Sequence, residues 1–429
     1  MGNESVKRRN MLKAGGMALV ALSPLPFVFA RGSQKPAALG EPAQLVRDPN
    51  GILDLPPGFR YRVLERALEP MSDGYRVPAR PDGMACFEDP SGALVLMRNH
   101  ENDHVSALGA YSGPAPVHAF DPRAYGGVTR LVVDPVRLER VSSNLVLTGT
   151  MRNCAGGPSP WGWLSCEEST EPGHGYVFLC RSDAAELARP ERIVGYGRFN
   201  HEAVCIDPAT NAAYLTEDRP DGCLYRFLPS DRAQPFVGKL QALRVTSSAR
   251  AELGELDTPG KKLAADWVDL REPDSSDDSL RHQAQALGAA VVRRGEGIWF
   301  ADDGVYVCAT IGGRAALGQI LKVVPERLGR GATVELVAAS PGETVLDHPD
   351  NITVAPWGDV YMAEDGYGEQ YVRALTPGGR IFDVARNAKS NTELAGVCFA
   401  PDGKTLFFNL QGDGLTVAVQ GPFEQLGRA

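Results

Sequence analysis

Residues 351–366 read NITVAPWGDVYMAEDG, and they decide the fold that the sequence predicts. Polar and apolar side chains alternate over residues 351–354, and they alternate again after the Pro-Trp-Gly run that ends at Gly358. Alternation with a period of two residues is typical of β-strands, and Pro and Gly between two such runs indicate a tight turn. The stretch therefore predicts a β-hairpin whose second strand ends at two acids, Glu364 and Asp365.

The same hairpin pattern recurs along the chain. Residues 203–218 and 396–410 repeat the order of strand, turn and aromatic-bearing strand, and weaker strand pairs occur elsewhere. The chain has 47 Gly and 32 Pro, and few segments show a helical period. Repeated units of about 40–50 residues, each with four strands and arranged radially, make a β-propeller. The sequence thus predicts an all-β fold, a β-propeller of about six blades, with a two-sheet sandwich as the alternative.

One interval breaks this rhythm. Residues 230–290 contain the acidic run 272–278 and a segment, residues 279–287, with the composition of a short helix. Asp277 or Asp278 would lie in the N-cap region of that helix, where acids are favoured. We expect this interval to be an excursion between two blades that forms part of the rim of the site.

The beginning of the chain reads as an export signal. Arg8 and Arg9 precede an apolar stretch, residues 14–30, that ends in a small-residue cleavage site. Paired arginines in this setting indicate the twin-arginine (Tat) route, so we expect the Tat translocon as a partner and a periplasmic or secreted protein. The predicted organisation is a Tat signal peptide over residues 1–30, an N-terminal extension over 31–55 and a propeller catalytic domain over 56–429.

Charge and hydropathy argue against two kinds of partner. The chain has 44 basic and 53 acidic residues, a formal net charge of −9, and no basic run beyond the signal peptide. Proteins that bind nucleic acid carry clustered basic residues, so we expect no nucleic-acid partner. No later segment reaches the ~20 apolar residues that a bilayer span needs, so we expect no stable membrane span in the mature chain.

Residues 153–168 read NCAGGPSPWGWLSCEE and carry the clearest metal signal. A short apolar strand ends at Cys166, and Glu167 and Glu168 follow directly. Thiolates suit iron and zinc, whereas carboxylates suit calcium, magnesium and manganese. Adjacent ligands of both types predict a mixed-metal centre, and the alternative is a buried cysteine followed by two solvated acids. None of the eight cysteines forms a CxxC pair, which argues against zinc-ribbon and thioredoxin-like sites.

Other acids lie where predicted strands end. In a propeller the innermost strands of all blades line one channel, so equivalent positions of distant segments meet there. Calcium takes about six to eight oxygen ligands, so such convergence favours a calcium site, although each acid alone would also suit a solvated loop end. The candidates are Glu101, Glu202, Glu217 with Asp218, Glu296, Asp350 and Glu364 with Asp365.

Arg294 lies two positions before Glu296, just ahead of a predicted strand. An arginine fork binds two phosphate oxygens at once, which makes Arg294 a candidate for binding an anionic substrate. An ordinary Arg–Glu neighbour pair on the surface is the alternative.

Taken together, these motifs resemble those of the PhoX family of bacterial alkaline phosphatases. The resemblance implies a Tat-exported, calcium-dependent phosphomonoesterase with a β-propeller fold and a centre that combines iron and calcium ions. It rests on motifs spread over most of the chain, namely residues 98–101, 153–168, 197–202, 214–218, 294–296, 349–351 and 364–366.

The resemblance also implies roles for individual residues. Cys166 matches the iron-bound cysteine, Glu296 matches a calcium-ligand glutamate, and Arg294 matches an arginine that binds the substrate phosphate. Arg294 and Glu296 are therefore the expected catalytic residues, and a small phosphomonoester is the expected substrate. The other expected metal ligands are Glu167, Glu202, Glu217, Asp218, Asp350 and Glu364.

Two other functions fit parts of the sequence. A calcium-dependent propeller lactonase or esterase would use acids such as Asp350 and Glu364 and would leave Cys166 without a role. A non-catalytic exported propeller would bind a ligand and turn over no phosphoester, even when folded and loaded with metal. Iron together with calcium distinguishes the phosphatase from the lactonase, which needs calcium alone.

Overall fold

The computed structural model describes residues 44–326 and 329–428, and the elements named here belong to one compact unit, which spans residues 36–429. The predicted signal peptide lies outside the described residues. Strands predominate in the described part, as the hairpin repeats predict, and the all-β prediction is confirmed. No helix among these residues is both long enough and apolar enough to cross a bilayer. The helices are α1 (Leu280–Ala286) and the short 3-10 helices η1 (Ser106–Leu108), η2 (Val194–Tyr196), η3 (Leu253–Glu255) and η4 (Phe423–Gln425).

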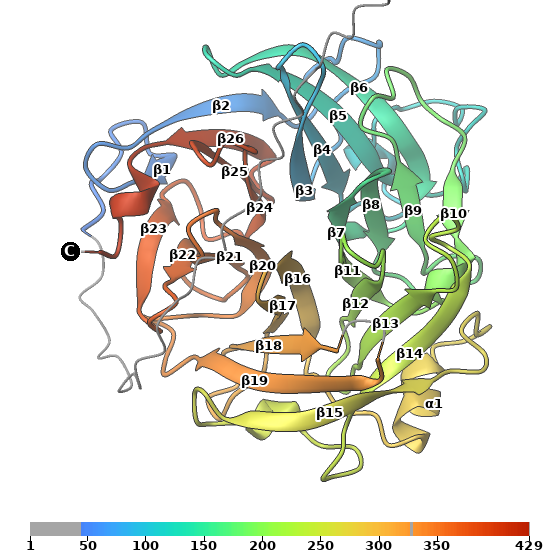
Figure 1. The fold of residues 1–429 in the computed structure, drawn as a ribbon. Coiled ribbons are helices and arrows are strands. Elements are labelled where there is room, and N and C mark those ends of the chain that lie inside the picture. Colours follow the sequence, from blue (N-terminus) through green and yellow to red (C-terminus); the bar gives the residue numbers. More distant parts are fainter. Residues whose placement is uncertain (1–43, 327–328, 429) are drawn as a thin grey trace, which may run out of the picture. The chain divides into compact units, whose positions relative to one another are not determined.

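Six strands form the inner wall of this unit (Figure 1). Each contacts the next in chain order, and the last contacts the first, so that the six close a ring. They are β3 (Pro81–Glu88), β7 (Asn153–Ser159), β11 (His201–Ile206), β16 (Gly295–Ala301), β20 (Pro349–Val354) and β24 (Leu394–Phe399).

Each inner strand begins an antiparallel series whose strands follow one another in the chain, which is a propeller-like arrangement. β3 leads to β4 (Leu94–His100), β5 (Gly126–Asp134) and β6 (Glu139–Thr150). β7 leads to β8 (Gly162–Glu167), β9 (Val177–Cys180) and β10 (Glu191–Ile193). β20 leads to β21 (Val360–Glu364), β22 (Tyr371–Leu375) and β23 (Ile381–Asn387), and β24 leads to β25 (Thr405–Leu410) and β26 (Leu415–Gln420).

One sheet departs from the four-stranded pattern. β11 continues through β12 (Ala213–Glu217), β13 (Leu224–Pro229) and β14 (Gly238–Val245), and β16 continues through β17 (Gly304–Ala309), β18 (Gln319–Pro325) and β19 (Gly331–Ala339). β15 (Lys262–Asp269) pairs with both β14 and β19, which joins the two series into one nine-stranded sheet. The described part therefore has five sheets, where the sequence predicts about six blades. The interval 230–290 supplies β14 and β15 to this sheet in addition to α1.

The two ends of the unit are joined by strand pairing. β2 (Arg60–Arg66) pairs with β26, so an early strand completes the sheet made by the last three strands. β1 (Leu53–Asp54), which falls in the predicted N-terminal extension, pairs with β23. These hydrogen bonds tie the beginning of the unit to its end and hold the ring of strands closed.

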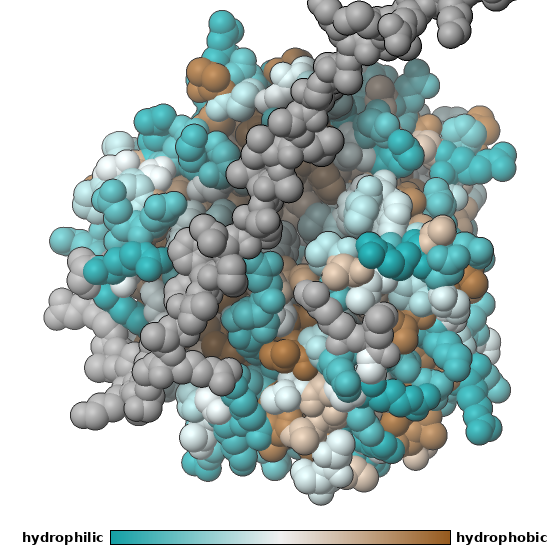
Figure 2. Space-filling view, viewed as in Figure 1, coloured by the Kyte–Doolittle hydropathy of each residue, from teal (hydrophilic) through white to brown (hydrophobic). Residues whose placement is uncertain are grey.

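The apolar cores lie between neighbouring sheets. Met84 and Leu96 of the β3 sheet, for example, share a buried cluster with Cys398 and Phe407 of the β24 sheet. Burial of these faces stabilises the contact between sheets that hydrogen bonds do not join. The face shown in Figure 2 carries mainly hydrophilic side chains with scattered apolar ones.

Glycines let the inner strands approach one another closely. A Cβ on Gly157 of β7 would lie 1.7 Å from the carbonyl oxygen of Val204 on β11. A Cβ on Gly297 of β16 would lie 2.4 Å from the carbonyl oxygen of Asp350 on β20. Neither distance is sterically possible, so a larger residue would push the strands apart. Polar side chains gather instead at the start of the inner strands, where Asp82, Glu202 and Glu296 are buried.

Candidate metal centre

Five of the six inner strands share one irregularity at their first residues. Each of these inner strands pairs with the next strand in the chain. In each pair the register shifts between the first paired residue of the inner strand and the residue three positions later. A β-bulge of this kind redirects the side chain beside it. In β24 the shift begins one residue later, at Ala395. The residue directly after the first pair is a potential metal ligand in each of the five strands: Asp82, Cys154, Glu202, Glu296 and Asp350.

One repeated hydrogen bond fastens the second strands to the same place. The residue after each second strand donates its backbone N–H to the carbonyl oxygen of the residue before the inner strand. Glu168 donates to Arg152 at 2.9 Å, for example, and Asp218 donates to Asn200 at 3.2 Å. Because the bond recurs around the ring, the residues that follow the second strands lie beside the bulges. They are Glu101, Glu168, Asp218, Thr310, Asp365 and Gln411.

Three groups of side chains at this level lie close enough to share metal ions. Within each group, the potential ligand atoms lie within 4.8 Å of one another. Glu101 belongs to two of the groups, so these two are continuous. The groups are Glu202 with Glu296 and Asp350, Asp82 with Glu101 and Glu393, and Glu101 with Cys154 and Glu168.

Burial makes the negative charges of this centre costly without a counter-ion. Burial, and then the charges of Glu296 and Asp350, raise the pKa of Glu202 far above its usual range. Burial raises the pKa of Asp82 to about 7, and burial together with the charge of Asp82 raises the pKa of Glu101 to about 8. A bound cation offsets both burial and mutual repulsion, so carboxyls in such a setting are suited to bind one.

Cys154 adds a sulfur ligand to the carboxylates. Its Sγ donates a hydrogen bond to Glu168 Oε2 at 3.3 Å. Burial, and then the charges of Glu202 and Glu168, raise the pKa of this thiol, whereas coordination to a metal removes the thiol proton. Asp82 Oδ1 is also buried and has no hydrogen-bond partner among the described residues. Carboxylates together with one thiol fit the ligand preferences of calcium and of iron.

Arg294 lies at the edge of the centre, immediately before β16. Its Nε and Nη2 donate to the two carboxylate oxygens of Asp218 at 2.8 and 3.0 Å. Nη2 also lies 2.6 Å from Glu296 Oε1. Burial opposes the charged form, but the charges of Glu296 and Asp218 raise the pKa of Arg294 above its ordinary value. The two expected catalytic residues, Arg294 and Glu296, are thus in direct contact.

Cys166 does not belong to any of the three groups of potential metal ligands. Its side chain is fully buried in a cluster that contains Leu164, Val177 and Leu215. Burial alone raises the pKa of its thiol, with no contribution from a neighbouring carboxylate. In the block 153–168, the geometry therefore places Cys154 at the centre in the position that the sequence analysis gave to Cys166.

Three expected metal ligands are engaged by hydrogen bonds within the fold. They are the last residues of β8, β12 and β21, and each directly precedes a residue that lies beside the bulges. Successive side chains of a strand point in opposite directions, so the first acid of each pair binds a loop and the second faces the centre. The bonds run from Gly175 N–H to Glu167 Oε2 (2.9 Å), from Tyr225 O–H to Glu217 Oε2 (2.7 Å) and from Asp347 N–H to Glu364 Oε1 (2.7 Å).

Asp82, Cys154 and Glu393 belong to the centre but were not expected there from the sequence, and Glu168 was expected only as one of the two acids after Cys166. The missed signal is a spacing of two residues: a polar residue directly precedes each of these inner strands, and the ligand is the second residue of the strand, inside the bulge. It reads Arg80-x-Asp82, Arg152-x-Cys154, Asn200-x-Glu202, Arg294-x-Glu296 and His348-x-Asp350.

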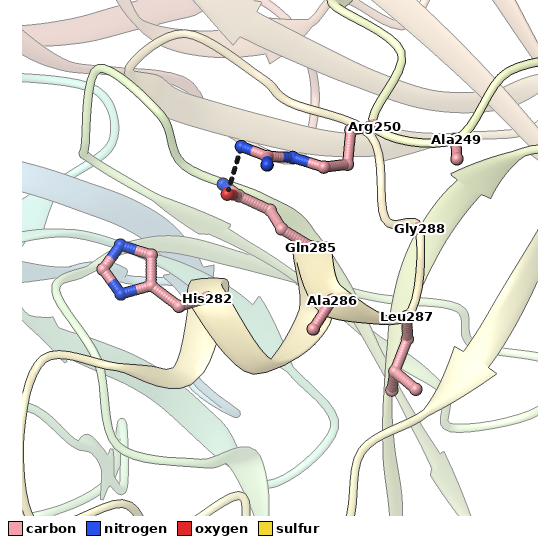
Figure 3. A pocket seen from close by; sticks show the side chains of 7 residues that line it. All are labelled: Ala249, Arg250, His282, Gln285, Ala286, Leu287 and Gly288. Atoms are coloured by element: carbon pink, nitrogen blue, oxygen red, sulfur yellow. Dashed lines mark hydrogen bonds between the residues drawn. The ribbon is translucent and has the colours of Figure 1, made fainter.

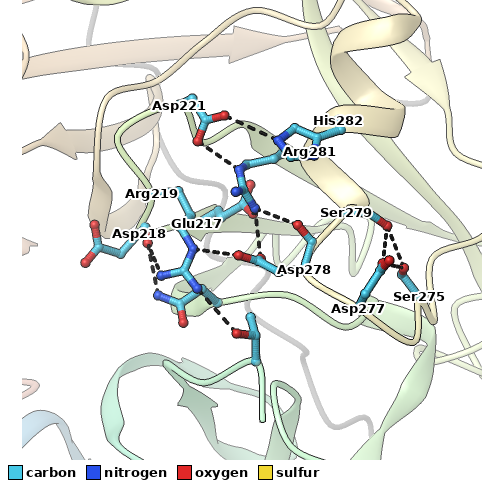
Figure 4. A network of polar contacts seen from close by, with 12 residues as sticks. Glu217, Asp218, Arg219, Asp221, Ser275, Asp277, Asp278, Ser279, Arg281 and His282 are labelled. Atoms are coloured by element: carbon cyan, nitrogen blue, oxygen red, sulfur yellow. Dashed lines mark hydrogen bonds and ion pairs between the residues drawn. The ribbon is translucent and has the colours of Figure 1, made fainter. Parts of the chain in front are cut away.

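Ion pairs fix the loops that surround Asp218 (Figure 4). Asp278, in the segment before α1, pairs with Arg219 at 3.0 Å and with Arg281 at 2.8 Å. Arg281 also lies 2.8 Å from Asp221. Because Arg219 and Asp221 belong to the loop after β12, these pairs hold the interval that contains α1 beside the loop that carries Asp218.

These features define a class of protein, a propeller-like fold with a buried centre of carboxylates and one thiol beside an arginine. A sequence model of the alkaline phosphatase PhoX family matches residues 41–144 and 133–414 of the chain. The chain therefore belongs to the PhoX family of alkaline phosphatases, and it is an enzyme of the phosphoric monoester hydrolase class. None of the curated proteins matches the chain significantly.

Several solved structures are similar to this chain, to different degrees. One of them is PhoX from Pseudomonas fluorescens in complex with vanadate, a transition-state analogue. It is 18% identical to this chain and has a TM-score of 0.69, and the match covers 89% of this chain and 97% of that chain. A gluconolactonase from Xanthomonas campestris is 14% identical, with a TM-score of 0.45 over 90% of this chain and 99% of that chain. A periplasmic gluconolactonase from Pseudomonas aeruginosa is 13% identical, with a TM-score of 0.43 over 83% and 90%. The first of these likenesses supports the propeller-like fold.

Proposed function

We propose that the protein hydrolyses phosphomonoesters at the centre described above, with calcium and iron as its cofactors. The observation that carries this proposal is the convergence of Glu202, Glu296 and Asp350 beside Arg294. Membership of the PhoX family supplies the reaction class. The arrangement suits that class, because phosphoryl transfer is accelerated chiefly by positive charge placed around the phosphoryl oxygens.

Magnitudes show why the acids matter more than any single side chain. Phosphate monoester hydrolysis is among the slowest uncatalysed reactions, and enzymes accelerate it by up to ~10²¹-fold. A single hydrogen-bond donor such as Arg294 typically changes the rate by only ~10²–10³-fold. Bound metal ions would supply the remaining positive charge and a strong nucleophile near neutral pH. The acids are thus proposed to serve as the ligands that hold this charge at the site.

We assign the three groups of ligands to ions by their chemistry. The group with a thiol, made of Glu101, Cys154 and Glu168, suits iron, because thiolates prefer iron to calcium. The two groups that contain only oxygen ligands suit calcium. This assignment moves the iron-bound cysteine from Cys166, as expected from the sequence, to Cys154.

Arg294 is proposed to bind the phosphoryl group. Asp218 and Glu296 engage its Nε and Nη2 and so fix the plane of the guanidinium. Its Nη1 has no hydrogen bond to the described residues, which leaves two N–H donors for phosphoryl oxygens.

Turnover of p-nitrophenyl phosphate by the purified protein tests the proposal. We expect activity that disappears on chelation and returns when calcium and iron are added, and elemental analysis should find both metals. Glu202→Gln should lower kcat more than ~100-fold, whereas Glu139→Gln, on an exposed ion pair with Arg62, should leave kcat unchanged. A folded, metal-loaded protein without turnover would instead be a binding propeller. Calcium without iron, together with turnover of a lactone, would indicate a lactonase.

We also propose six blades and export by the Tat route. The nine-stranded sheet counts as two blades, since the series from β11 and β16 each carry the bulge and the repeated hydrogen bond. Residues 1–30 would be the signal peptide, and residues 56–429 the catalytic domain. Replacing Arg8 and Arg9 with lysine should keep the protein out of the periplasmic fraction, and unchanged export would contradict the Tat assignment.

A further inference from the structure

We propose that Arg152 is a second substrate-binding residue, which holds the phosphoryl group together with Arg294. This inference rests on the proposed phosphatase function and adds a residue to it. Neither the family motifs nor the expected ligand set includes Arg152.

Arg152 occupies the position in its sheet that Arg294 occupies in another. Both residues directly precede an inner strand, and both accept the repeated backbone hydrogen bond from the end of the second strand, Arg152 from Glu168 and Arg294 from Thr310, each at 2.9 Å. Both have a left-handed backbone, with φ of +44° at Arg152 and +49° at Arg294. Such values are uncommon for residues with a side chain and occur most often at functional sites, where the surroundings hold them in place.

The backbone of Arg152 is fixed on both sides. Its N–H donates to the carbonyl oxygen of Asn102 at 2.8 Å, and its carbonyl oxygen accepts from Glu168. Asn102 and Glu168 follow the ends of β4 and β8, so Arg152 lies between two sheets at the level of the metal ligands. The side chain therefore starts from a defined point at the edge of the centre.

The guanidinium of Arg152 has no partner within the described part of the chain. Its Nε is buried and makes no hydrogen bond, and the described residues form no ion pair with it. Arg294, by contrast, is engaged by Asp218 and Glu296. A buried N–H without an acceptor destabilises a fold unless a ligand supplies the acceptor. An arginine with five free donors is suited to an anion with several oxygens, such as a phosphoryl group.

Hydrogen bonds connect Arg152 to the residues around Arg294. Glu168, whose N–H donates to the carbonyl oxygen of Arg152, accepts a hydrogen bond on Oε1 from Asn200 Nδ2 at 2.8 Å. The same Nδ2 donates to the carbonyl oxygen of Asp218 at 2.9 Å, and the side chain of Asp218 binds Arg294. Arg152 and Arg294 thus border the same set of carboxylates. Once metal ions neutralise those carboxylates, the donors of Arg152 remain available for substrate.

Binding of inorganic phosphate to the metal-loaded protein tests this assignment. The test variant is Arg152→Asn, because asparagine tolerates a left-handed backbone and removes the charge. We expect the Kd for phosphate, measured by calorimetry, to rise about 10–100-fold, and KM for p-nitrophenyl phosphate to rise more than kcat falls. Arg152→Lys, which keeps the charge and loses the fork, should fall between this variant and the wild type.

The matched control is Arg250→Asn. Arg250 also has a left-handed backbone, with φ of +53°, but it lines a shallow pocket beside α1 and donates to Gln285 Oε1 at 3.2 Å (Figure 3). This variant should leave the Kd for phosphate unchanged.

Three outcomes separate the possibilities. A Kd for Arg152→Asn within twofold of the wild type would overturn the assignment while leaving the phosphatase proposal intact. Loss of iron or calcium from this variant, in proportion to the loss of phosphate binding, would also overturn it, because Arg152 would then support the metal ligands. A wild type that neither binds phosphate nor hydrolyses p-nitrophenyl phosphate would instead refute the proposed function itself.

Discussion

Asp218 accepts one hydrogen bond from Arg294 on each of its two carboxylate oxygens, at 2.8 and 3.0 Å. From the sequence, Asp218 was expected to bind a metal ion. In the structure its two oxygens are instead arranged to hold a guanidinium, so we treat Asp218 as a positioning residue for Arg294.

Asp218→Asn should lower kcat/KM for p-nitrophenyl phosphate about tenfold, mainly through a higher KM. A neutral amide offers one acceptor oxygen, so Arg294 would lose one charge-assisted hydrogen bond and turn more freely. Steady-state kinetics measures the effect. Asp183→Asn, which removes a carboxylate from an exposed ion pair with Arg181, is the control and should behave as the wild type. Equal effects of the two changes would contradict the positioning role.

The two cysteines of the block 153–168 should respond differently to removal of sulfur. Cys154→Ser should release iron and lower activity more than ~100-fold, since a hydroxyl is a poor substitute for a thiolate ligand. Cys166→Ala should keep both iron and activity and lower the free energy of unfolding by about 1–2 kcal/mol, because it leaves a small cavity among apolar side chains. Elemental analysis and denaturant titration measure the two results. Loss of iron from Cys166→Ala alone would reinstate Cys166 as the ligand.

Gly157→Ala should destabilise the fold by about 3 kcal/mol or more. The new methyl group would meet the carbonyl oxygen of Val204 on the neighbouring inner strand, and the backbone there cannot move without opening the ring. Thermal or denaturant unfolding measures the change. Gly342→Ala is the control, because a Cβ there has open space and the change should stay within about 0.5 kcal/mol. Similar stability of both variants would show that the ring is less tightly packed than described.

The metal-free protein should become less stable as the pH rises. The pKa of Asp82 is raised to about 7 and that of Glu101 to about 8 in the folded state, against ~3.9 and ~4.3 for unfolded carboxyls. Between those values the folded state binds more protons than the unfolded state, so the free energy of unfolding is largest near pH ~4 and falls as the pH rises through about 8.

The measurement is Tm in a chelator at about pH 5 and about pH 8.5, with and without added calcium. Tm should be lower at the higher pH in the chelator, and calcium should shrink the difference, because bound cations replace the protons as partners of the carboxylates. A Tm that rises with pH in the chelator would contradict the described burial of these acids.

Local patterns were sufficient to predict the strands. The period of two residues and the Pro-Gly turns in residues 351–366 are properties of the chain itself, and the structure has β20 and β21 there. The link through β15, which merges two series into a nine-stranded sheet, was not predictable in this way. It depends on pairing between segments that are far apart in sequence, and no local pattern specifies such partners.

The sequence predicted which strand ends carry the acids of the candidate site. It did not predict which side chains point into the site. Glu202, Glu296 and Asp350 were expected to converge, and their ligand atoms lie within 4.8 Å of one another. The sequence does not state which of Glu167 and Glu168 faces inward, because loop N–H groups that bind Glu167 decide it. The choice between Cys154 and Cys166 depends likewise on a bulge in β7, and the spacing Arg152-x-Cys154 that accompanies it is recognisable only when the inner strands are compared with one another.

The bulge that recurs at the start of the inner strands has a practical consequence for protein engineering. The bulge sets the direction of the side chain whatever the amino acid. Asp82 and Cys154 show this, because they occupy equivalent positions in two strands of different sequence. Replacing the residue at one of these positions would change the number of oxygen and sulfur ligands. The backbone hydrogen bonds of the sheet would stay the same. Ion preference could therefore be retuned one position at a time on an unaltered scaffold.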